Sequence, residues 1–555
     1  MTMTHEQLLD AAVTCGLVDA EAADRLQSTA RRQGADLLDL VTTHGRFPVA
    51  ALYRALAAAR DLPFVDLEGA VWSQPLVRRV PESLMVRHQV LPIAQESDGV
   101  RVATANPDDG QTISALQRVL GQPIHLAVAD PESLASTIRR ALAEARPGAA
   151  GIAAVPAAAP IDAVAALDRL LKEAFLRRAS DIHLEPQDDR LRVRLRVDGR
   201  LRAYPAELGL GEGSSLVSRV KVLSGLDIAE QRAPQDGGFS CTLAGVQAVR
   251  IDIRVATSPT RWGERVTLRL LGLETEDLTL EGLGMSPNDL QVFRTVIRRP
   301  HGMILLTGPT GSGKTTTLYA ALREINHPDR NILTVENPIE YVVPGISQVQ
   351  VGEKVTFASA LRSLLRHDPD ILMVGEIRDA ETADVAIKAA MTGHLVFSTL
   401  HANSACAAVS RLQDLECEPY LIGATLIAVI AQRLVRRLCP WCKRARPASA
   451  AELTWLGDAS GDSPGVKVTP PIPTDVSLYE PVGCAHCLGS GFRGRIGLFE
   501  AFWIDRHISQ QIGLGATQAE LEMAVAGRMT HLREDGMTKA LAGLTSLDDV
   551  IAATV

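Results

Sequence analysis

Apolar and charged side chains alternate strictly along three neighbouring stretches of the chain. Leu191–Asp198 and Val249–Val255 show this alternation, and Arg265–Leu270 continues it after a turn at Trp262-Gly263. A period of two predicts half-exposed strands, here with arginines on the outer face. Any one of these arginines is either solvated or, at a domain or subunit boundary, placed to reach a nucleotide phosphate.

Further along, short runs that are largely apolar predict strands buried on both faces, with helical stretches between them. The predicted strands are Met303–Leu306, Asn331–Val335, Ile371–Val374 and Leu395–Thr399, and the helices are Thr316–Leu322 and Ala358–Leu365. Strands that alternate with helices indicate an α/β domain with a parallel sheet.

The first 145 residues have a different pattern. Leu8–Val13 and Glu21–Arg32 predict helices, whereas Leu62–Leu67 and Gly99–Ala105 predict short strands. No catalytic constellation occurs here, so we interpret this region as an interaction or docking module. Residues 146–160 hold three prolines among small side chains, which predicts a flexible linker. Ala163–Arg178 then predicts the first helix of a new domain.

A glycine-rich stretch, Gly308-Pro309-Thr310-Gly311-Ser312-Gly313-Lys314-Thr315, fits the phosphate-binding pattern G-x-x-x-x-G-K-[ST]. It lies between a predicted strand and a predicted helix, as the pattern requires. The glycines let backbone N–H groups converge on phosphate oxygens at the positive end of the helix. Lys314 would reach the β- and γ-phosphates of ATP, and Thr315 would hold Mg²⁺. The alternative is a glycine-rich turn that binds nothing.

Carboxylates follow two of the predicted strands, and histidines flank a third. Glu336 and Glu340 come after one strand, and Glu376 ends another behind a glycine. Glu376 is therefore the acidic group available to Mg²⁺, directly or through water, unless it is only a surface carboxylate. His394 and His401 bracket a strand and are either γ-phosphate sensors or structural residues.

Four of the eight cysteines form two C-x-x-C pairs, Cys439/Cys442 and Cys484/Cys487. Together they offer four soft ligands for a closed tetrahedral Zn²⁺ site. Redox dithiols and a site that has lost its metal remain as alternatives. The other four cysteines are expected to be ordinary thiols.

Composition narrows the function classes. The chain has 46% hydrophobic and 22% charged residues, which is typical of a globular protein, and its net charge of −8 argues against nucleic acid as the main partner. The longest apolar run, Tyr420–Ala431, is too short to span a membrane, and Met1–Asp10 does not resemble a secretory signal. We therefore expect a cytoplasmic protein.

From residue 161 onward the chain resembles the secretion ATPases of type II secretion systems and type IV pilus assembly. The matching motifs are Ala179–Pro186, the glycine loop, the carboxylate segment ending at Glu340, Arg366–Asp370 with Gly375–Asp379, Thr392–Asn403 and the four cysteines. The resemblance implies an α/β, RecA-like P-loop ATPase domain, a preceding α+β (PAS-like) domain, a helical/α+β N-terminal module and a tetracysteine zinc subdomain.

The resemblance also implies domains and site residues. The expected domains are a docking module (1–145), a linker (146–160), an α+β domain (161–275) and an ATPase domain (276–555) that includes the tetracysteine subdomain (439–500) and the C-terminal helices from Gln518. Glu376 would be the catalytic carboxylate and Glu340 its support. The further residues expected at the nucleotide are Lys314, Thr316, His394, His401, Arg254, Arg269, Arg362, Arg366, Arg378 and Arg495. Asn337 departs from the family's usual aspartate.

The implied function is that of a hexameric ATPase powering pseudopilus assembly and protein export. Its partners would be inner-membrane assembly and platform proteins, and it would touch the membrane only through them. Thr260–Val266 and Thr315–Leu322 favour the type II secretion branch. The alternatives are a pilus extension ATPase, a nucleotide-gated scaffold with little turnover, and a DNA motor. Gln7-Leu8-Leu9-Asp10 replaces the family's Arg-Leu-Gly motif, so cyclic di-GMP is not expected as a ligand.

Overall fold

The computed structural model describes most of the chain, and the chain divides into two compact units. The described residues are 4–33, 36–45, 48–67, 72–145, 163–204, 208–243, 249–272, 278–340, 342–352, 354–457 and 476–554. Unit 1 comprises Met1–Leu273 and Gly483–Gly491, and unit 2 comprises Glu274–Val482 and Phe492–Val555. The predicted linker, 146–160, lies outside the described residues.

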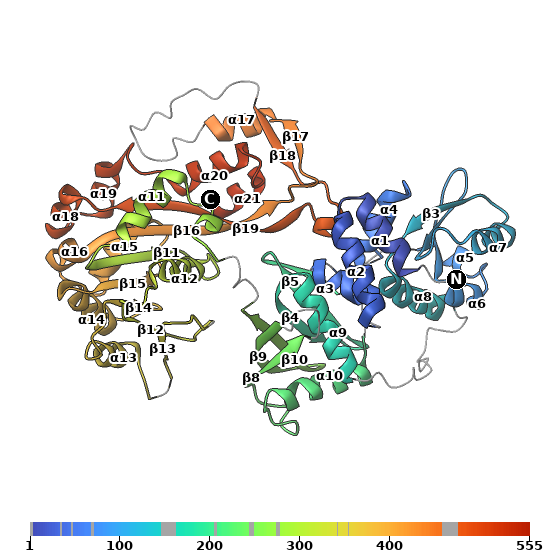
Figure 1. Cartoon of the computed structure of the whole chain (residues 1–555), viewed down its shortest axis with the longest axis horizontal. Coiled ribbons are helices and arrows are strands. Elements are labelled where there is room, and N and C mark those ends of the chain that lie inside the picture. Colours follow the sequence, from blue (N-terminus) through green and yellow to red (C-terminus); the bar gives the residue numbers. More distant parts are fainter. Residues whose placement is uncertain are drawn as a thin grey trace. The chain divides into compact units, whose positions relative to one another are not determined.

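Unit 1 begins with helices that pack on a small sheet (Figure 1). The helices are α1 (His5–Thr14), α2 (Ala20–Gln33), α3 (Leu37–Gly45), α4 (Val49–Ala59), α5 (Gln74–Val77), α6 (Glu82–His88), α7 (Gly110–Leu120) and α8 (Pro131–Ala145). The sheet has the order β1 (Val90–Gln95), β2 (Val100–Thr104), β3 (Ile124–Val128). The two predicted helices and the strand at Gly99–Ala105 are confirmed.

The strand predicted at Leu62–Leu67 is wrong in extent. Only Phe64 forms a bridge, to Val128 of β3. The backbone hydrogen bonds here are Val65 N to Val128 O and Val128 N to Pro63 O, both 2.9 Å long. Pro63 has no N–H to donate, so the pairing does not continue toward the start of the segment.

The α+β part of unit 1 contains two helices and an antiparallel sheet. The helices are α9 (Ala163–Leu176) and α10 (Leu210–Leu223). The strands are β4 (Ala179–Pro186), β5 (Arg190–Val197), β6 (Arg200–Ala203), β7 (Leu208–Gly209), β8 (Gln235–Leu243), β9 (Val249–Thr260) and β10 (Gly263–Leu271), in the order β6-β5-β4-β10-β9-β8, with β7 paired to β5. The strands predicted from alternation are therefore confirmed. Arg254 and Arg269 lie directly opposite one another on β9 and β10.

Unit 2 is built on a sheet of seven strands. Its order is β13 (Ser347–Gln350), β12 (Ile332–Glu336), β14 (Ile371–Val374), β15 (Leu395–Leu400), β11 (Gly302–Thr307), β16 (Leu426–Leu438) and β19 (Phe492–Trp503). All neighbours pair in parallel except β16 and β19. The four strands predicted from apolar runs are central in this sheet, where both faces are covered.

Helices cover the two faces of this sheet with separate cores (Figure 1). On one face lie η1 (Glu281–Leu283), α11 (Pro287–Val296) and α12 (Lys314–Ile325), packed on Ile304, Leu306 and Phe397. On the other face, strand residues such as Leu305 and Leu372, which alternate along the strands with those of the first core, pack against a second group of helices. These helices are α13 (Phe357–Leu364), α14 (Ala380–Met391), α15 (Ala405–Asp414), α16 (Pro419–Thr425), α18 (Arg506–Gly513) and α19 (Gln518–Val525).

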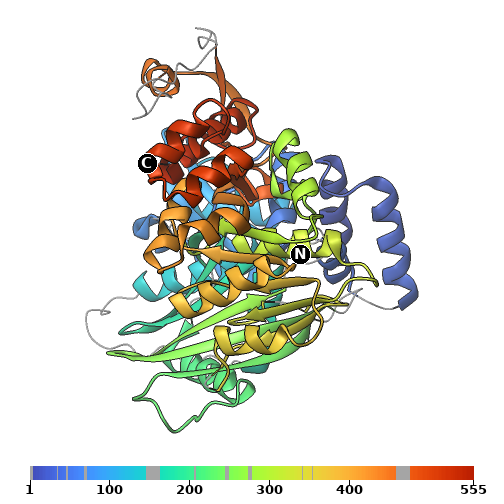
Figure 2. The ribbon, with the colours of Figure 1, turned by 90° about the vertical axis from the view of Figure 1, so that its left-hand side faces the viewer.

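The end of the chain completes unit 2. Helices α20 (Leu532–Leu541) and α21 (Leu547–Thr554), red in Figures 1 and 2, pack against each other and against β19 and β16. The tetracysteine region adds β17 (Arg444–Pro447), α17 (Ala450–Gly457), β18 (Ser477–Glu480) and η2 (Ala485–Cys487), the last of these in unit 1. Among the described residues, no helix is both long and apolar enough to cross a bilayer.

Candidate nucleotide and metal sites

Side-chain hydrogen bonds tie together the carboxyl ends of three neighbouring strands in unit 2. The Thr307 hydroxyl at the end of β11 donates to the Ala402 carbonyl (2.9 Å) and accepts from the Ala402 N–H (2.8 Å). The Thr399 hydroxyl on β15 donates to the Gly375 carbonyl (2.8 Å) after β14. These bonds hold the loops that follow β11, β14 and β15 at one edge, where open α/β sheets bind ligands.

The glycine loop follows β11 at this edge. Gly308, Gly311 and Gly313 have φ angles of 142°, 80° and 86°, which glycine adopts without strain. Gly313 precedes α12, and no side chain caps this helix at that position. The Ser312 hydroxyl is buried and has no hydrogen-bond partner among the residues that the structure describes. An uncapped helix start with an orphaned buried hydroxyl beside it fits a phosphate group.

Lys314 begins α12 and folds back over the loop. Its ammonium donates to the carbonyls of Gly308 (2.8 Å) and Pro309 (3.1 Å). Burial lowers the pKa of Lys314, whereas the charge of Glu376 raises it and that of Arg433 lowers it further. The lysine therefore lies within electrostatic range of both charges, as a phosphate-binding cation at this edge requires.

Glu376 lies in the loop after β14, with its carboxylate largely buried. Arg378 Nη2 is 2.7 Å from Glu376 Oε1, and His401 Nε2 is 3.7 Å from Glu376 Oε2. The structure thus brings together four of the predicted residues, Lys314, Glu376, Arg378 and His401, from three strand ends. A carboxylate that faces a lysine and a histidine can orient a water molecule for attack on a phosphate.

Two residues of β16 belong to this site although the sequence analysis missed them. The Thr317 hydroxyl of α12 donates to Gln432 Oε1 (2.8 Å), and Gln432 is almost fully buried. Arg433 donates from Nη2 to the Asn403 carbonyl (3.1 Å). A Cβ on Gly308 would lie 2.4 Å from the Gln432 carbonyl and 3.2 Å from Arg433 Nη1. The sequence did contain a sign of their role, because the polar pair Gln432-Arg433 interrupts an otherwise apolar strand.

The two carboxylates near the end of β12 have different surroundings. Glu336 is buried and accepts hydrogen bonds from Tyr319 Oη, from Thr334 Oγ1 (2.6 Å) and from Gln348 Nε2 (3.0 Å). This carboxylate therefore joins α12, β12 and β13. Glu340, by contrast, is exposed four residues after the strand end.

Other predicted residues lie away from the glycine loop. The His394 carbonyl accepts from Gly302 N (3.1 Å) at the start of β11, so His394 and His401 lie at opposite edges of the sheet, about 20 Å apart along the strand. Arg362 lies in the last turn of α13 and pairs with Glu381 in the first turn of α14 (2.8 Å), and Arg366 follows α13. Among the described residues, no hydrogen bond or ion pair joins His394, Arg362 or Arg366 to the glycine loop.

The remaining predicted arginines lie on strands. Arg495 on β19 is exposed and stands opposite Arg436 of β16. In unit 1, Arg269 Nε donates to Asp181 Oδ1 (3.0 Å), and Arg254 is its neighbour across the strands.

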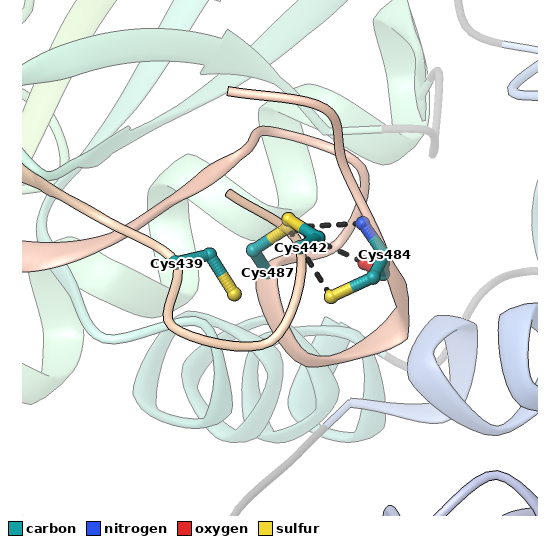
Figure 3. Close-up of side chains that lie close together, drawn as sticks. All are labelled: Cys439, Cys442, Cys484 and Cys487. Carbon is teal, nitrogen blue, oxygen red and sulfur yellow. Dashed lines mark hydrogen bonds between the residues drawn. The ribbon is translucent and has the colours of Figure 1, made fainter. Parts of the chain in front are cut away.

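The four predicted cysteines converge, as Figure 3 shows. The sulfur atoms of Cys439, Cys442, Cys484 and Cys487 all lie within 4.8 Å of one another. Cys484 Sγ and Cys487 Sγ are 3.8 Å apart, which is about the edge of a tetrahedron with zinc–sulfur bonds of 2.3 Å. Cys487 Sγ also accepts from the N–H groups of Cys484 (3.1 Å) and Gly491 (3.2 Å), as thiolate ligands do. The donor set fits a tetrahedral zinc ion.

Comparison with known proteins adds the family. The family model described as Type II/IV secretion system protein matches residues 157–552. The chain belongs to this family. A second model, described as the MshEN domain, matches residues 60–148 of the N-terminal region. The family resemblance seen in the sequence is confirmed.

Two relatives show how the similarity is distributed. Type II secretion system protein E of Pectobacterium carotovorum subsp. carotovorum is 47% identical over 390 residues, covering 70% of this chain and 75% of the relative. The type IV pilus assembly ATPase PilB of Myxococcus xanthus is 36% identical over 563 residues, covering 97% of both chains. The prediction that this chain is an ATPase of the secretion and pilus family is confirmed by these matches.

A solved structure supports the fold. The ATPase DotB of Legionella pneumophila superposes with a TM-score of 0.52 at 22% identity, covering 72% of this chain and 97% of that chain. The family matches and the cysteine cluster confirm the predicted fold class. It combines a RecA-like P-loop domain with a preceding α+β domain, a helical/α+β N-terminal module and a tetracysteine subdomain.

Proposed function

We propose that this chain hydrolyses Mg-ATP at the carboxyl edge of the unit 2 sheet and thereby powers pseudopilus assembly in type II secretion. The observation that carries the proposal is the convergence of Lys314, Glu376 and His401 beside an uncapped, glycine-rich helix start. The high identity to type II secretion system protein E over the ATPase region supports the choice of system.

Each residue of the site would have a distinct task. Lys314 would leave the loop carbonyls and neutralise charge on the β- and γ-phosphates, while Glu376 orients the attacking water and His401 holds Glu376 in place. Thr315 and Glu376 would hold Mg²⁺, which when bound shields the charge between the phosphates. Arg254, Arg269, Arg362, Arg366 and Arg495 are proposed to act at the boundary between domains or subunits, with Glu340 in support of Glu376.

The same proposal covers the assembly. The chain would work as a homohexamer in the cytoplasm, held at the inner membrane by assembly and platform proteins. Residues 1–145 would be the docking module, 146–160 a linker, 161–275 the domain that supplies Arg254 and Arg269, and 276–555 the motor domain. Cys439, Cys442, Cys484 and Cys487 would hold a structural Zn²⁺.

A second candidate is supported by a different observation. The similarity to the pilus assembly ATPase of Myxococcus xanthus extends over 97% of the chain, including the N-terminal region. This favours pilus extension as the alternative. Deleting the gene in its bacterium would separate the two, because loss of secreted proteins with normal pili supports type II secretion, and loss of pili with normal secretion supports the alternative.

The enzymatic proposal is tested with Glu376→Gln and Lys314→Ala in the full chain. We expect Glu376→Gln to bind ATP while phosphate release falls by roughly 100-fold or more, since the group that orients water is lost. Lys314→Ala should lose affinity for ATP as well. Unchanged hydrolysis by either variant would show that the site is wrong. Negligible turnover by the unmodified chain, even with membrane partner and acidic lipid, would favour a nucleotide-gated scaffold.

A further inference from the structure

The second cysteine pair lies in a short turn that contacts the N-terminal helices. This segment, Gly483–Gly491, is called here the cysteine turn. It belongs to unit 1, although the chain on both sides of it belongs to unit 2. Ordering these nine residues costs conformational entropy, which their contacts within unit 1 must outweigh.

The contact has an apolar part. Ala485 and Leu488 of the cysteine turn pack against the helical core that includes Ala51, Leu52 and Ala55 of α4. These three α4 residues are fully buried. Ala51 and Ala55 are four residues apart and therefore lie on the same face of α4. Because their side chains are small, another backbone segment can approach this face closely, as the cysteine turn does.

The contact also has a charged part. Arg54 of α4 has a side chain that is only 16% exposed, and its guanidinium stacks at 4.1 Å from the centre of the Phe64 ring. Asp66 is 3.5 Å away, and within the described part of the chain Arg54 Nε is buried without a hydrogen-bond partner. A buried cation with so little compensation is costly unless further negative charge lies nearby.

The cysteine turn can supply that charge. The Arg54 guanidinium lies against the turn, since a Cβ on Gly489 would be 2.6 Å from Arg54 Nη1. Burial lowers the pKa of Arg54, whereas Asp66, Cys487 and Asp130 oppose that effect and Arg177 adds to it. Four thiolates around one Zn²⁺ carry a net charge of about −2, so the loaded site would place anionic sulfur beside the buried arginine.

We propose that the cysteine turn is a metal-organised docking surface for α4, with Arg54 as the cation that pairs with the zinc–thiolate group. The metal orders the turn, the turn covers the alanine face of α4, and Arg54 in return stabilises the bound metal. This inference rests on the zinc site proposed above and adds a task to it, namely to hold the N-terminal helices.

The charged part is tested by the rate at which the full chain releases zinc to a coloured chelator. Zinc content is measured first by atomic absorption, which separates failure of the metal proposal from failure of this one. We expect Arg54→Met to release zinc roughly tenfold faster, as for other groups that support a metal ligand, and Arg54→Lys to be intermediate. Arg87→Met removes an exposed arginine of α6 and should release zinc at the normal rate. Equal rates for Arg54→Met and the unmodified chain would overturn the pairing.

The docking part is tested by hydrogen exchange of the peptides covering Val49–Ala59. Leu488→Asp should speed their exchange, whereas Leu514→Asp, at a leucine that is 89% exposed, should not. Removing zinc from the unmodified chain should also expose α4 while exchange in β11 stays slow. Unchanged α4 protection both in Leu488→Asp and after zinc removal would show that the turn does not hold the helix.

Discussion

At the scale of single residues, the position of a side chain on the sheet determines whether it belongs to the candidate site, even where the sequence pattern does not distinguish it from another. His394 and His401 bracket the same strand, yet only His401 lies beside Glu376, at 3.7 Å. His394 Nδ1 instead lies 2.9 Å from the Ala389 carbonyl at the end of α14. Parallel strands place all their carboxyl ends at one edge, so residues at the two ends of one strand serve different sites.

Because the two histidines lie in different surroundings, we expect their replacement to affect ATP hydrolysis unequally. In the purified full chain, His401→Ala should lower kcat by roughly tenfold or more, because Glu376 loses the group that orients it. His394→Ala should leave kcat within about twofold, and it serves as the matched control. The measurement is steady-state phosphate release at saturating ATP. An equal loss of kcat in both variants would contradict the placement.

A second residue-scale prediction concerns Gly308. Its φ angle of 142° is favourable for glycine and strained for residues that have a Cβ atom. In addition, a Cβ atom at this position would lie 2.4 Å from the Gln432 carbonyl oxygen. Gly308→Ala should therefore weaken ATP binding by roughly tenfold or more. Gly352→Ala, where nothing lies within 4 Å of the added carbon, is the control. Fluorescent nucleotide titration measures both, and normal affinity in Gly308→Ala would refute the argument.

At the scale of elements, one buried carboxylate joins the C-terminal helices to the motor sheet. Glu500 on β19 accepts from the Ala405 N–H at the start of α15 (2.7 Å), and its other oxygen lies 3.2 Å from His531 Nδ1 at the start of α20. It also acts electrostatically on Arg433 beside the glycine loop. The end of the chain is thus linked through Glu500 to an arginine of the candidate site.

This link makes stability depend on pH. The hydrogen bond to Glu500 raises the pKa of His531 above its ordinary value. A histidine whose pKa is raised on folding stabilises the native state fully below its unfolded pKa, near 6.5, and this contribution is lost as the pH rises through the folded value. His531→Gln should therefore lower the calorimetric unfolding temperature more at pH 6 than at pH 8.5. A difference that is the same at both values would show that the pair contributes no proton-linked stability.

At the scale of the whole molecule, the site described in unit 2 lacks most of its predicted arginines. Arg254 and Arg269 belong to unit 1, whereas Arg362 lies in the last turn of α13, where it pairs with Glu381, and Arg366 follows that helix. We propose that some of these arginines act on nucleotide from a neighbouring subunit of the proposed hexamer. Activity would then depend on assembly rather than on the folded chain alone.

Assembly dependence can be measured directly. We expect the specific ATPase activity of the full chain to rise steeply with protein concentration over the range in which light scattering shows hexamers forming. Activity that is independent of concentration across the dissociation range would indicate a self-sufficient protomer. Mixing Lys314→Ala with Arg269→Ala chains gives a second measurement, because mixed hexamers should recover part of the activity if Arg269 acts across the subunit boundary.

Local sequence determined a large part of this protein. The alternation in Leu191–Asp198 and the apolar runs such as Ile371–Val374 predicted the strands correctly, since the period of side-chain burial is a local property. The glycine loop and the cysteine pairs were also visible, because their chemistry depends on short fixed spacings. Leu62–Leu67 failed as a strand, since pairing needs a partner and donors that a local pattern does not reveal.

The tertiary structure alone decided which distant residues meet. Gln432 and Arg433 reach the glycine loop because β16 pairs with β11, and no spacing in the sequence encodes that neighbour. Glu336 and Glu340 look equivalent along the chain, but the fold buries one among three donors and exposes the other. The cysteine turn packs on α4 although more than 400 residues separate them. Such contacts depend on strand order and helix packing, which are properties of the whole fold and not of any local pattern.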